Sequence, residues 1–124
     1  MKNHPMQRGT RWLGQIGEKL AGEYFKKKKY QIVERNFRCR YGEIDLILRK
    51  NQAYHFVEVK FRRNLQYGLP QESVIKRKQF RIRRLALMWL KKRCLPVDLG
   101  IHFDVLAISR IDGNTTFELI ENAF

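Results

Sequence analysis

The sequence predicts a single α/β domain in which a mixed sheet is flanked by two helices. Apolar residues recur at helical spacing in two segments, and five shorter segments are rich in the β-branched and aromatic residues that strands prefer. These segments follow the order helix, three strands, helix, two strands. A chain of 124 residues is long enough for one hydrophobic core, and no repeat or linker divides it.

The first helix is expected over residues 11–28. Leu13, Ile16 and Leu20 form its apolar stripe, Thr10 can cap it, and Glu18 lies on the margin of the stripe. A glutamate on a helix is usually only a solvated side chain. The preceding residues 1–10 are polar and include two basic side chains, so we expect a flexible basic arm there and one domain over residues 11–124.

The other elements follow from alternation and from turn residues. Strands are expected over residues 30–37, 42–48, 54–60, 102–109 and 115–120, and a second helix over residues 71–92. Turns are expected at Asn51-Gln52 and at Asp112-Gly113. Because a helix separates the third strand from the fourth, we expect these two strands to be joined by a right-handed crossover.

The charge of the chain favours a polyanionic partner. The 26 Lys and Arg residues outnumber the 12 Asp and Glu residues, and all but Arg110 of the basic residues precede Cys94. Each neutralised phosphate releases counterions, so nucleic acid is the natural partner of such a surface. A solvated basic face, an anionic membrane surface and association with another protein are the alternatives.

Other classes of protein have little support. No segment approaches the ~18 apolar residues of a membrane span, and residues 1–10 lack the apolar centre of a signal peptide, so we expect a cytoplasmic protein that does not enter membranes. Cys39 and Cys94 are isolated, and the three histidines are scattered. These spacings favour reduced thiols and give no support to a histidine-based metal site.

Within the hairpin of residues 42–62, three charged side chains lie in the middle of apolar strand sequence, namely Asp45, Glu58 and Lys60. Burying an unpaired charge is costly, so each requires a partner. A two-residue turn at Asn51-Gln52 would set Asp45 opposite Glu58, with Cβ atoms about 4.5–5.5 Å apart. Lys60 would share their face of the sheet, since strand side chains alternate with period two. A turn one residue longer would move Asp45 to the other face.

Two opposed carboxylates repel unless a cation lies between them or one is protonated. Oxygen ligands of this kind suit Mg²⁺ or Mn²⁺, and Lys60 could orient water or stabilise charge on a phosphate. The structural alternative is a salt-bridge ladder in which Lys60 pairs with Glu43 and Glu58. That ladder leaves Asp45 without a partner, so we favour the metal site.

Basic residues near the hairpin and on the second helix are candidates for binding nucleic acid. An ordinary amphipathic helix would show a similar charge pattern, so this interpretation depends on the neighbouring carboxylates. The candidate contacts are Arg38, Arg40, Arg62, Lys76, Lys78 and Arg81.

Several motifs in order resemble a known family. They are Gly14-x-x-Gly17-Glu18-x-x-Ala21-x-x-Tyr24, Arg35-Asn36-x-Arg38, Gly42-Glu43-Ile44-Asp45-Leu46-Ile47, Phe56-Val57-Glu58-Val59-Lys60-x-Arg62, Gly68-x-Pro70-x-Glu72-x-Val74-x-x-x-Lys78 and Phe103-Asp104-Val105. Together they look like the YraN family of small bacterial proteins. The order of elements with these charged residues also resembles the PD-(D/E)XK restriction-endonuclease-like fold, a three-layer core, and within it the archaeal Holliday junction resolvases.

The resemblance implies roles for the residues that match. Asp45, Glu58 and the backbone carbonyl of Val59 would face a metal, Glu18 would be an additional acid, Lys60 would be the catalytic lysine, and Lys78 would contact phosphate. The implied function is a Mg²⁺- or Mn²⁺-dependent endonuclease acting on DNA, including branched or damaged structures. The alternative is a non-catalytic nucleic-acid-binding protein that retains the fold. Resolvase-like folds often act as dimers, so a homodimer is one expected assembly.

Overall fold

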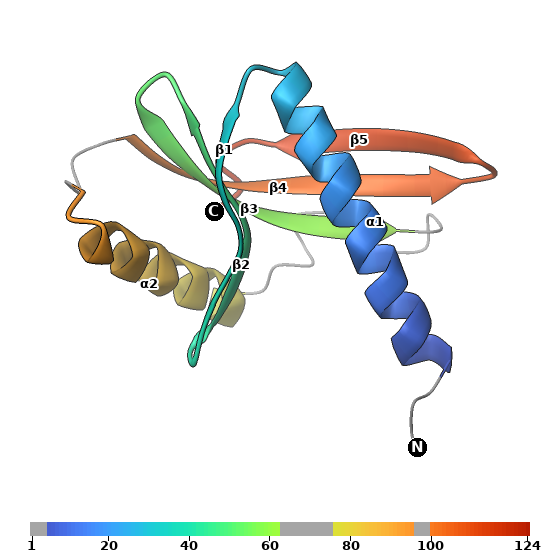
Figure 1. The fold of residues 1–124 in the computed structure, drawn as a ribbon, viewed down its shortest axis with the longest axis horizontal. Helices are drawn as coiled ribbons and strands as arrows, with labels where there is room; N and C mark the ends of the chain where they lie inside the picture. Colours follow the sequence, from blue (N-terminus) through green and yellow to red (C-terminus); the bar gives the residue numbers. More distant parts are fainter. Residues whose placement is uncertain (1–4, 63–75, 96–99) are drawn as a thin grey trace.

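The computed structural model describes residues 5–62, 76–95 and 100–124, with side chains described from Gln15 onward. Figure 1 shows two helices and five strands in this part of the chain. Their bounds are α1 Pro5–Lys27, β1 Gln31–Cys39, β2 Gly42–Lys50, β3 Ala53–Arg62, α2 Lys76–Lys92, β4 Gly100–Ile111 and β5 Asn114–Ile120. The predicted α/β class, with a five-stranded mixed sheet and two helices, is confirmed.

The strands lie in the sheet in chain order, β1-β2-β3-β4-β5. β3 and β4 are parallel, and the other three neighbouring pairs are antiparallel. Parallel neighbours need a long connection rather than a tight turn, and α2 lies within that connection. The predicted placement of a helix between the third and fourth strands is therefore confirmed.

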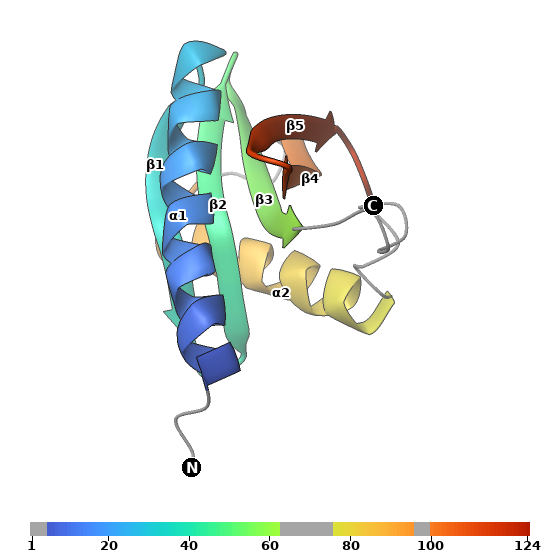
Figure 2. The ribbon, with the colours of Figure 1, turned by 90° about the vertical axis from the view of Figure 1, so that its right-hand side faces the viewer.

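The two helices cover different clusters of core residues. Phe25 and Ala21 of α1 pack against β2, β3 and β4 side chains such as Leu48 and Leu106. Trp89 and Leu85 of α2 pack in a second cluster with Phe56 and other strand residues. Figure 2 shows α1 in front of β1 and β2, with α2 running across behind them. The sheet is thus covered by one helix on each face.

The boundaries of the helices differ from the prediction. α1 begins at Pro5 rather than near Arg11, so residues 5–10, predicted to belong to an arm, form its first turns. Proline is favoured at the start of a helix because its fixed φ suits the helix and its missing N–H needs no partner there. Residues 1–4 and the predicted start of the second helix, residues 71–75, lie outside the described part.

The predicted β2–β3 turn and its register are confirmed. Asn51 and Gln52 have φ values of 52° and 64°, as a two-residue type I′ turn requires. The pairing runs from Lys50 with Ala53 to Leu46 with Val57. Asp112 and Gly113 likewise have positive φ values in the β4–β5 turn.

Neither helix in the described part of the chain combines the length and the apolar character that crossing a membrane requires.

Candidate active site

Asp45 and Glu58 lie where β2 and β3 cease to pair. Backbone pairing between these strands ends at Leu46 and Val57, and one further step of the same register sets Asp45 opposite Glu58. Beyond this point β2 continues to pair with β1, and β3 continues to pair with β4. The two carboxylates therefore occupy the place where the sheet loses its hydrogen-bonded ladder.

The Asp45 carboxylate replaces part of that ladder. Its Oδ2 atom accepts a hydrogen bond from the backbone N–H of Val59 at 2.8 Å. Burial, followed by the nearby Glu58 carboxylate, raises the pKa of Asp45 to about 7, although the Val59 hydrogen bond opposes this shift. Asp45 can therefore exchange a proton near neutral pH.

Glu58 is buried and held by two lysines. Lys60 Nζ lies 3.2 Å from Glu58 Oε2, and Lys78 Nζ of α2 donates a hydrogen bond to the same oxygen. Burial alone would lower the pKa of Lys78, but the hydrogen bond and attraction to Glu58 raise it above its ordinary value. The site thus keeps Lys78 protonated beside a carboxylate that is 8 % exposed.

Glu18 and Val59, the remaining predicted site residues, are less closely associated with the two carboxylates. Glu18 is half-buried on α1, but no group of three or more His, Cys, Asp or Glu side chains in the described residues is placed to hold a metal. The structure therefore brings Asp45, Glu58 and Lys60 together without making Glu18 a third carboxylate of the group. Val59 contributes its N–H to Asp45. A role for its carbonyl, like that for Glu18, stays a prediction.

The predicted salt-bridge ladder is formed only in part. Glu43 pairs with Arg38 of β1, their Nε and Oε2 atoms lying 2.9 Å apart, whereas Lys60 pairs with Glu58. Asp45 accepts a hydrogen bond from the Val59 N–H, and the Glu58 carboxylate repels its negative charge. The ladder alternative therefore accounts for Glu58 but leaves the second carboxylate without an ion-pair partner in the described part of the chain.

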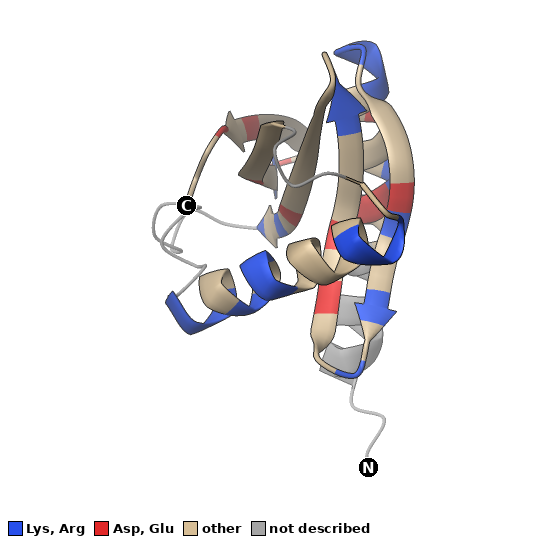
Figure 3. Cartoon of the chain, turned by 90° about the vertical axis from the view of Figure 1, so that its left-hand side faces the viewer, with Lys and Arg blue, Asp and Glu red and all other residues tan. Residues whose placement is uncertain are grey.

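The predicted nucleic-acid contacts are spread over four parts of the fold: Arg38 on β1, Arg40 in the β1–β2 turn, Arg62 on β3, and Lys76, Lys78 and Arg81 on α2. Lys and Arg residues recur along α2 and at the β1–β2 turn (Figure 3). Lys76 and Arg81 are exposed on α2, and Arg40 lies over the Tyr41 ring, its Cζ 5.3 Å from the ring centre. Arg62 is largely buried at the end of β3, 4.0 Å from Glu118. Lys78 reaches Glu58, so its first contact is with protein rather than with solvent.

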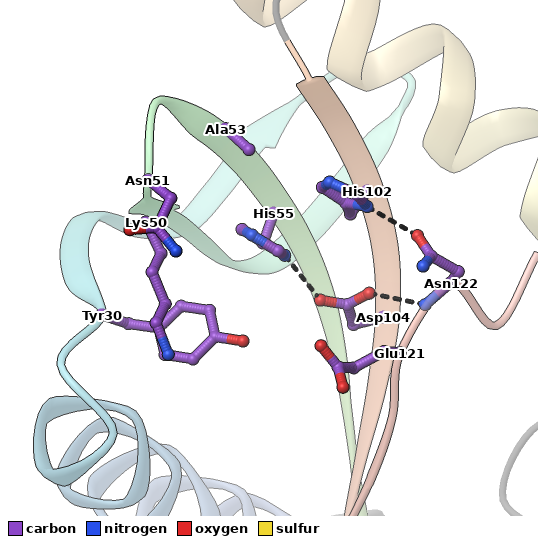
Figure 4. Close-up of a pocket in the computed structure, with 9 residues that line it drawn as sticks. All are labelled: Tyr30, Lys50, Asn51, Ala53, His55, His102, Asp104, Glu121 and Asn122. Atoms are coloured by element: carbon purple, nitrogen blue, oxygen red, sulfur yellow. Dashed lines mark hydrogen bonds and ion pairs between the residues drawn. The ribbon is translucent and has the colours of Figure 1, made fainter.

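A different polar cluster surrounds a cavity of about 320 Å³ near the β2–β3 turn. The parallel register of β3 and β4 stacks the rings of His55 and His102 at 4.6 Å, although the two residues are far apart in sequence. Figure 4 shows that Asp104 and Asn122 are their hydrogen-bond partners. Because an ionised carboxylate only accepts hydrogen bonds, His55 Nδ1 donates to Asp104.

The cluster anchors the C-terminal segment. The fully buried Asp104 also accepts a hydrogen bond from Asn122 N, and Ala123 N donates to Phe103 O next to it. Sequence reasoning treated the histidines as scattered and did not expect this network. Its satisfied hydrogen bonds give Asp104 a structural reason to be buried.

Asp45 and Glu58 provide carboxylate oxygens that suit a hard divalent cation as ligands. Asp45 Oδ1 and Glu58 Oε1 accept no hydrogen bond from the described residues. Mg²⁺ usually takes one or two carboxylates and completes its coordination with water and phosphate oxygens, so a third carboxylate is unnecessary. The residues present therefore fit such an ion.

Comparisons with known proteins agree with the motifs. Residues 17–108 match the model of the "Uncharacterised protein family UPF0102". The chain belongs to this family. UPF0102 is the YraN family, so the predicted resemblance is confirmed.

Two UPF0102 proteins illustrate the extent of the similarity. A protein of Trichlorobacter lovleyi is 45% identical over 119 residues, covering 94% of this chain and 93% of the relative. A protein of Syntrophomonas wolfei is 45% identical over 117 residues, covering 93% of this chain and 99% of the relative. UPF0102 membership therefore extends over nearly the whole chain.

Proposed function

We propose that this protein is a metal-dependent phosphodiesterase that cleaves DNA, with a restriction-endonuclease-like core of the resolvase type. The observation that carries the proposal is the opposition of Asp45 and Glu58 at the end of the β2–β3 ladder, with two lysines at Glu58. Asp45 and Glu58 would hold Mg²⁺ or Mn²⁺. When bound, the ion would activate water and stabilise the leaving oxyanion.

The protein's own groups would supply the remaining functions. The Lys60 side chain is 25 % exposed and the Lys78 side chain is 36 % exposed, so neither is sealed in the core, and both ammonium groups would contact a phosphate bound beside Glu58. Positive charge fixed beside a scissile phosphate stabilises the charge that develops there. Asp45, with a pKa of about 7, would give up its proton when a cation replaces it.

A second candidate function is binding of nucleic acid without cleavage. It is favoured by one observation, that Glu58 already has two lysine partners and is thus neutralised without an added ion. In this case the lysines stabilise the fold and the basic surface alone serves binding. The two candidates differ in whether Asp45 and Glu58 take up a metal.

A cleavage assay tests the first proposal. Single-stranded, duplex, flap and four-way DNA would be incubated with Mn²⁺ or Mg²⁺ and with the wild type, Asp45→Asn, Lys60→Ala or Glu43→Gln. Glu43 is an exposed carboxylate on the same strand that pairs with Arg38, so Glu43→Gln is the matched control. We expect cleavage to require a divalent ion, to be lost in Asp45→Asn and Lys60→Ala, and to persist in Glu43→Gln.

Titration calorimetry with Mn²⁺ separates the two functions. Binding heat that disappears in Asp45→Asn supports the nuclease. Salt-sensitive DNA binding, with no metal heat and no cleavage of any of the four DNA structures, would instead establish the non-catalytic function.

A further inference from the structure

A groove of about 200 Å³ lies between the β1–β2 turn and α2. Two aromatic side chains, three arginines and a methionine line it: Tyr41, Phe80, Arg77, Arg81, Arg84 and Met88. Tyr41 is 50 % exposed and Phe80 is 64 % exposed. The groove therefore presents aromatic surface and positive charge to solvent in the same place.

Packing of the core does not account for these aromatic rings. α2 buries its opposite side through Ile82, Leu85 and Trp89, and Phe80 lies off that apolar stripe. A single exposed apolar residue needs no explanation. Here, however, two rings from elements far apart in sequence line one groove, which is a pattern typical of a binding surface.

The arginines of the groove are available to an anionic ligand. Two other basic side chains, one in the first turn of α2 and one just after its C-terminal end, are engaged: Lys78 pairs with Glu58, and Arg93 pairs with Glu34. Within the described residues, Arg77, Arg81 and Arg84 form no ion pair with an acidic side chain. Three guanidinium groups beside exposed rings would attract a ligand that carries negative charge and flat apolar faces.

Gly42 allows the turn to approach the helix so closely. A Cβ atom at this position would lie 3.0 Å from Arg81 Cδ and 3.3 Å from Leu85 Cδ1. Its φ of 139° is also a conformation that other residues rarely adopt. The absence of a side chain thus places Tyr41 against the arginines of α2.

α2 contributes residues to both the groove and the candidate active site, and the turn that carries Tyr41 leads directly into β2. Arg77 is adjacent in sequence to Lys78, which contacts Glu58. Gly42 begins the strand that carries Asp45. A strand of nucleic acid that extended from the groove along α2 toward its first turn would approach Lys78, which contacts Glu58.

We infer that this groove binds an unpaired segment of nucleic acid, with bases stacked on Tyr41 and Phe80 and phosphates on the three arginines. Base faces are accessible to aromatic side chains only where the bases are unstacked, as in single strands, flaps and junction openings. If the protein cleaves DNA as proposed, its substrate contains an unpaired strand beside the scissile bond, and only this consequence rests on the proposed function. Binding itself requires neither metal nor cleavage.

Fluorescence anisotropy with labelled oligonucleotides tests the inference independently of cleavage. All proteins would carry Asp45→Asn and be kept in EDTA, and the probes would be a single strand of about 12 nucleotides and the duplex of the same sequence. A poly-glutamate peptide of equal length would serve as a polyanion without bases. The groove variants are Tyr41→Ala, Phe80→Leu, Phe80→Trp and Arg84→Gln. Leu87→Ala is the matched control, since Leu87 is an exposed apolar residue of α2 outside the groove.

We expect the single strand to bind more tightly than the duplex and the peptide. Tyr41→Ala and Phe80→Leu should each weaken single-strand binding by on the order of ten-fold, because a stacked base is lost. Leu87→Ala should bind as the parent does, and Phe80→Trp, which keeps an aromatic face for stacking, should retain the binding that Phe80→Leu loses. For Arg84→Gln, the slope of the logarithm of the association constant against the logarithm of salt concentration should become shallower by roughly 0.7, because one phosphate contact with the single strand is removed.

Two results would overturn the inference. One is single-strand affinity that is unchanged in both Tyr41→Ala and Phe80→Leu. The other is peptide binding as tight as oligonucleotide binding, which would indicate an acidic protein partner. Since these side chains are exposed, melting curves like that of the parent are expected and would confirm that the variants are folded. Absence of cleavage in the earlier assay would disprove the nuclease and leave these binding results unaffected.

Discussion

Lys78 on α2 donates a hydrogen bond to the Glu58 carboxylate on β3, and this contact joins the helix to the middle of the sheet. Lys60 approaches the same oxygen from two residues along β3. The acidic end of the β2–β3 hairpin is therefore neutralised by one local lysine and one distant lysine. The distant lysine makes the site dependent on the docking of α2.

Removal of Lys78 should destabilise the protein because Glu58 would lose one of two partners while remaining buried. We expect Lys78→Met to lower the free energy of unfolding by about 1–2 kcal/mol, reduced from the value for a fully buried pair by the partial exposure of Lys78. Urea denaturation measures the change. Lys76→Met, at an exposed position of the same helix, should have little effect. Adding Glu58→Gln to Lys78→Met should recover part of the loss, and equal losses in the Lys76 and Lys78 variants would contradict the prediction.

The raised pKa of Asp45 predicts an unusual pH dependence of stability without metal. The folded protein holds this proton up to a pH of about 7, whereas the unfolded chain releases it near the ordinary aspartate pKa of 3.8. Between these values the folded state binds more protons, so its stability falls as pH rises. Each rise of one pH unit between these two values lowers the free energy of unfolding by up to about 1.4 kcal/mol.

Asp45→Asn removes this titration and keeps an acceptor for Val59 N–H. We expect the variant, relative to wild type in EDTA, to become progressively more stable as pH rises from about 5 to about 8. Urea denaturation at both pH values gives the difference. An unchanged difference between the two proteins across this range would show that Asp45 is already ionised.

Asp104 should be important for the C-terminal segment. Its replacement by alanine leaves His55 Nδ1 and Asn122 N without their acceptor. We therefore expect Asp104→Ala to lower the free energy of unfolding, measured by urea denaturation, by about 2 kcal/mol or more. Amide hydrogen exchange should also accelerate at Ala123, whose N–H bonds to Phe103 O. Glu121→Gln is the control, because Glu121 is an exposed carboxylate at the same cavity. The anchoring role fails if exchange at Ala123 is unchanged in Asp104→Ala.

Gly42→Ala should destabilise the protein more than Gly113→Ala does. Both glycines have positive φ. The 79° at Gly113 lies close to the left-handed region, which costs an alanine on the order of 1 kcal/mol, whereas the 139° at Gly42 lies outside that region and is less accessible to an alanine. Only at Gly42 would the new Cβ also press on Arg81 and Leu85, whereas nothing lies within 4 Å at Gly113. Thermal melting of the two variants compares the costs directly. Similar melting temperatures would mean that α2 moves away from the turn without penalty.

Local patterns were sufficient for the elements and for the hairpin register. Alternating apolar residues and the two-residue turn at Asn51-Gln52 depend on neighbours in the chain, so the sequence predicted that Asp45 and Glu58 would face each other. The position of Pro5 at the start of α1 was also readable, but the polar composition of residues 1–10 favoured an arm instead.

Contacts between elements were harder to predict. Lys78 was expected to bind phosphate, and its pairing with Glu58 depends on how α2 crosses the sheet. The stacking of His55 on His102 depends on the parallel register of β3 and β4, which no local pattern specifies. Phe80 provided a usable signal, since it is a large aromatic residue that departs from the apolar stripe of its own helix.

The sequence by itself determined the family, the α/β class and the opposition of Asp45 and Glu58, because each follows from motifs, periodicities or a turn within a short segment. Only the tertiary structure decided that Glu58 binds Lys78 and that Tyr41 and Phe80 line one groove. These relationships join residues from separate elements. They depend on the angle and depth at which each helix packs on the sheet, which the whole core sets at once.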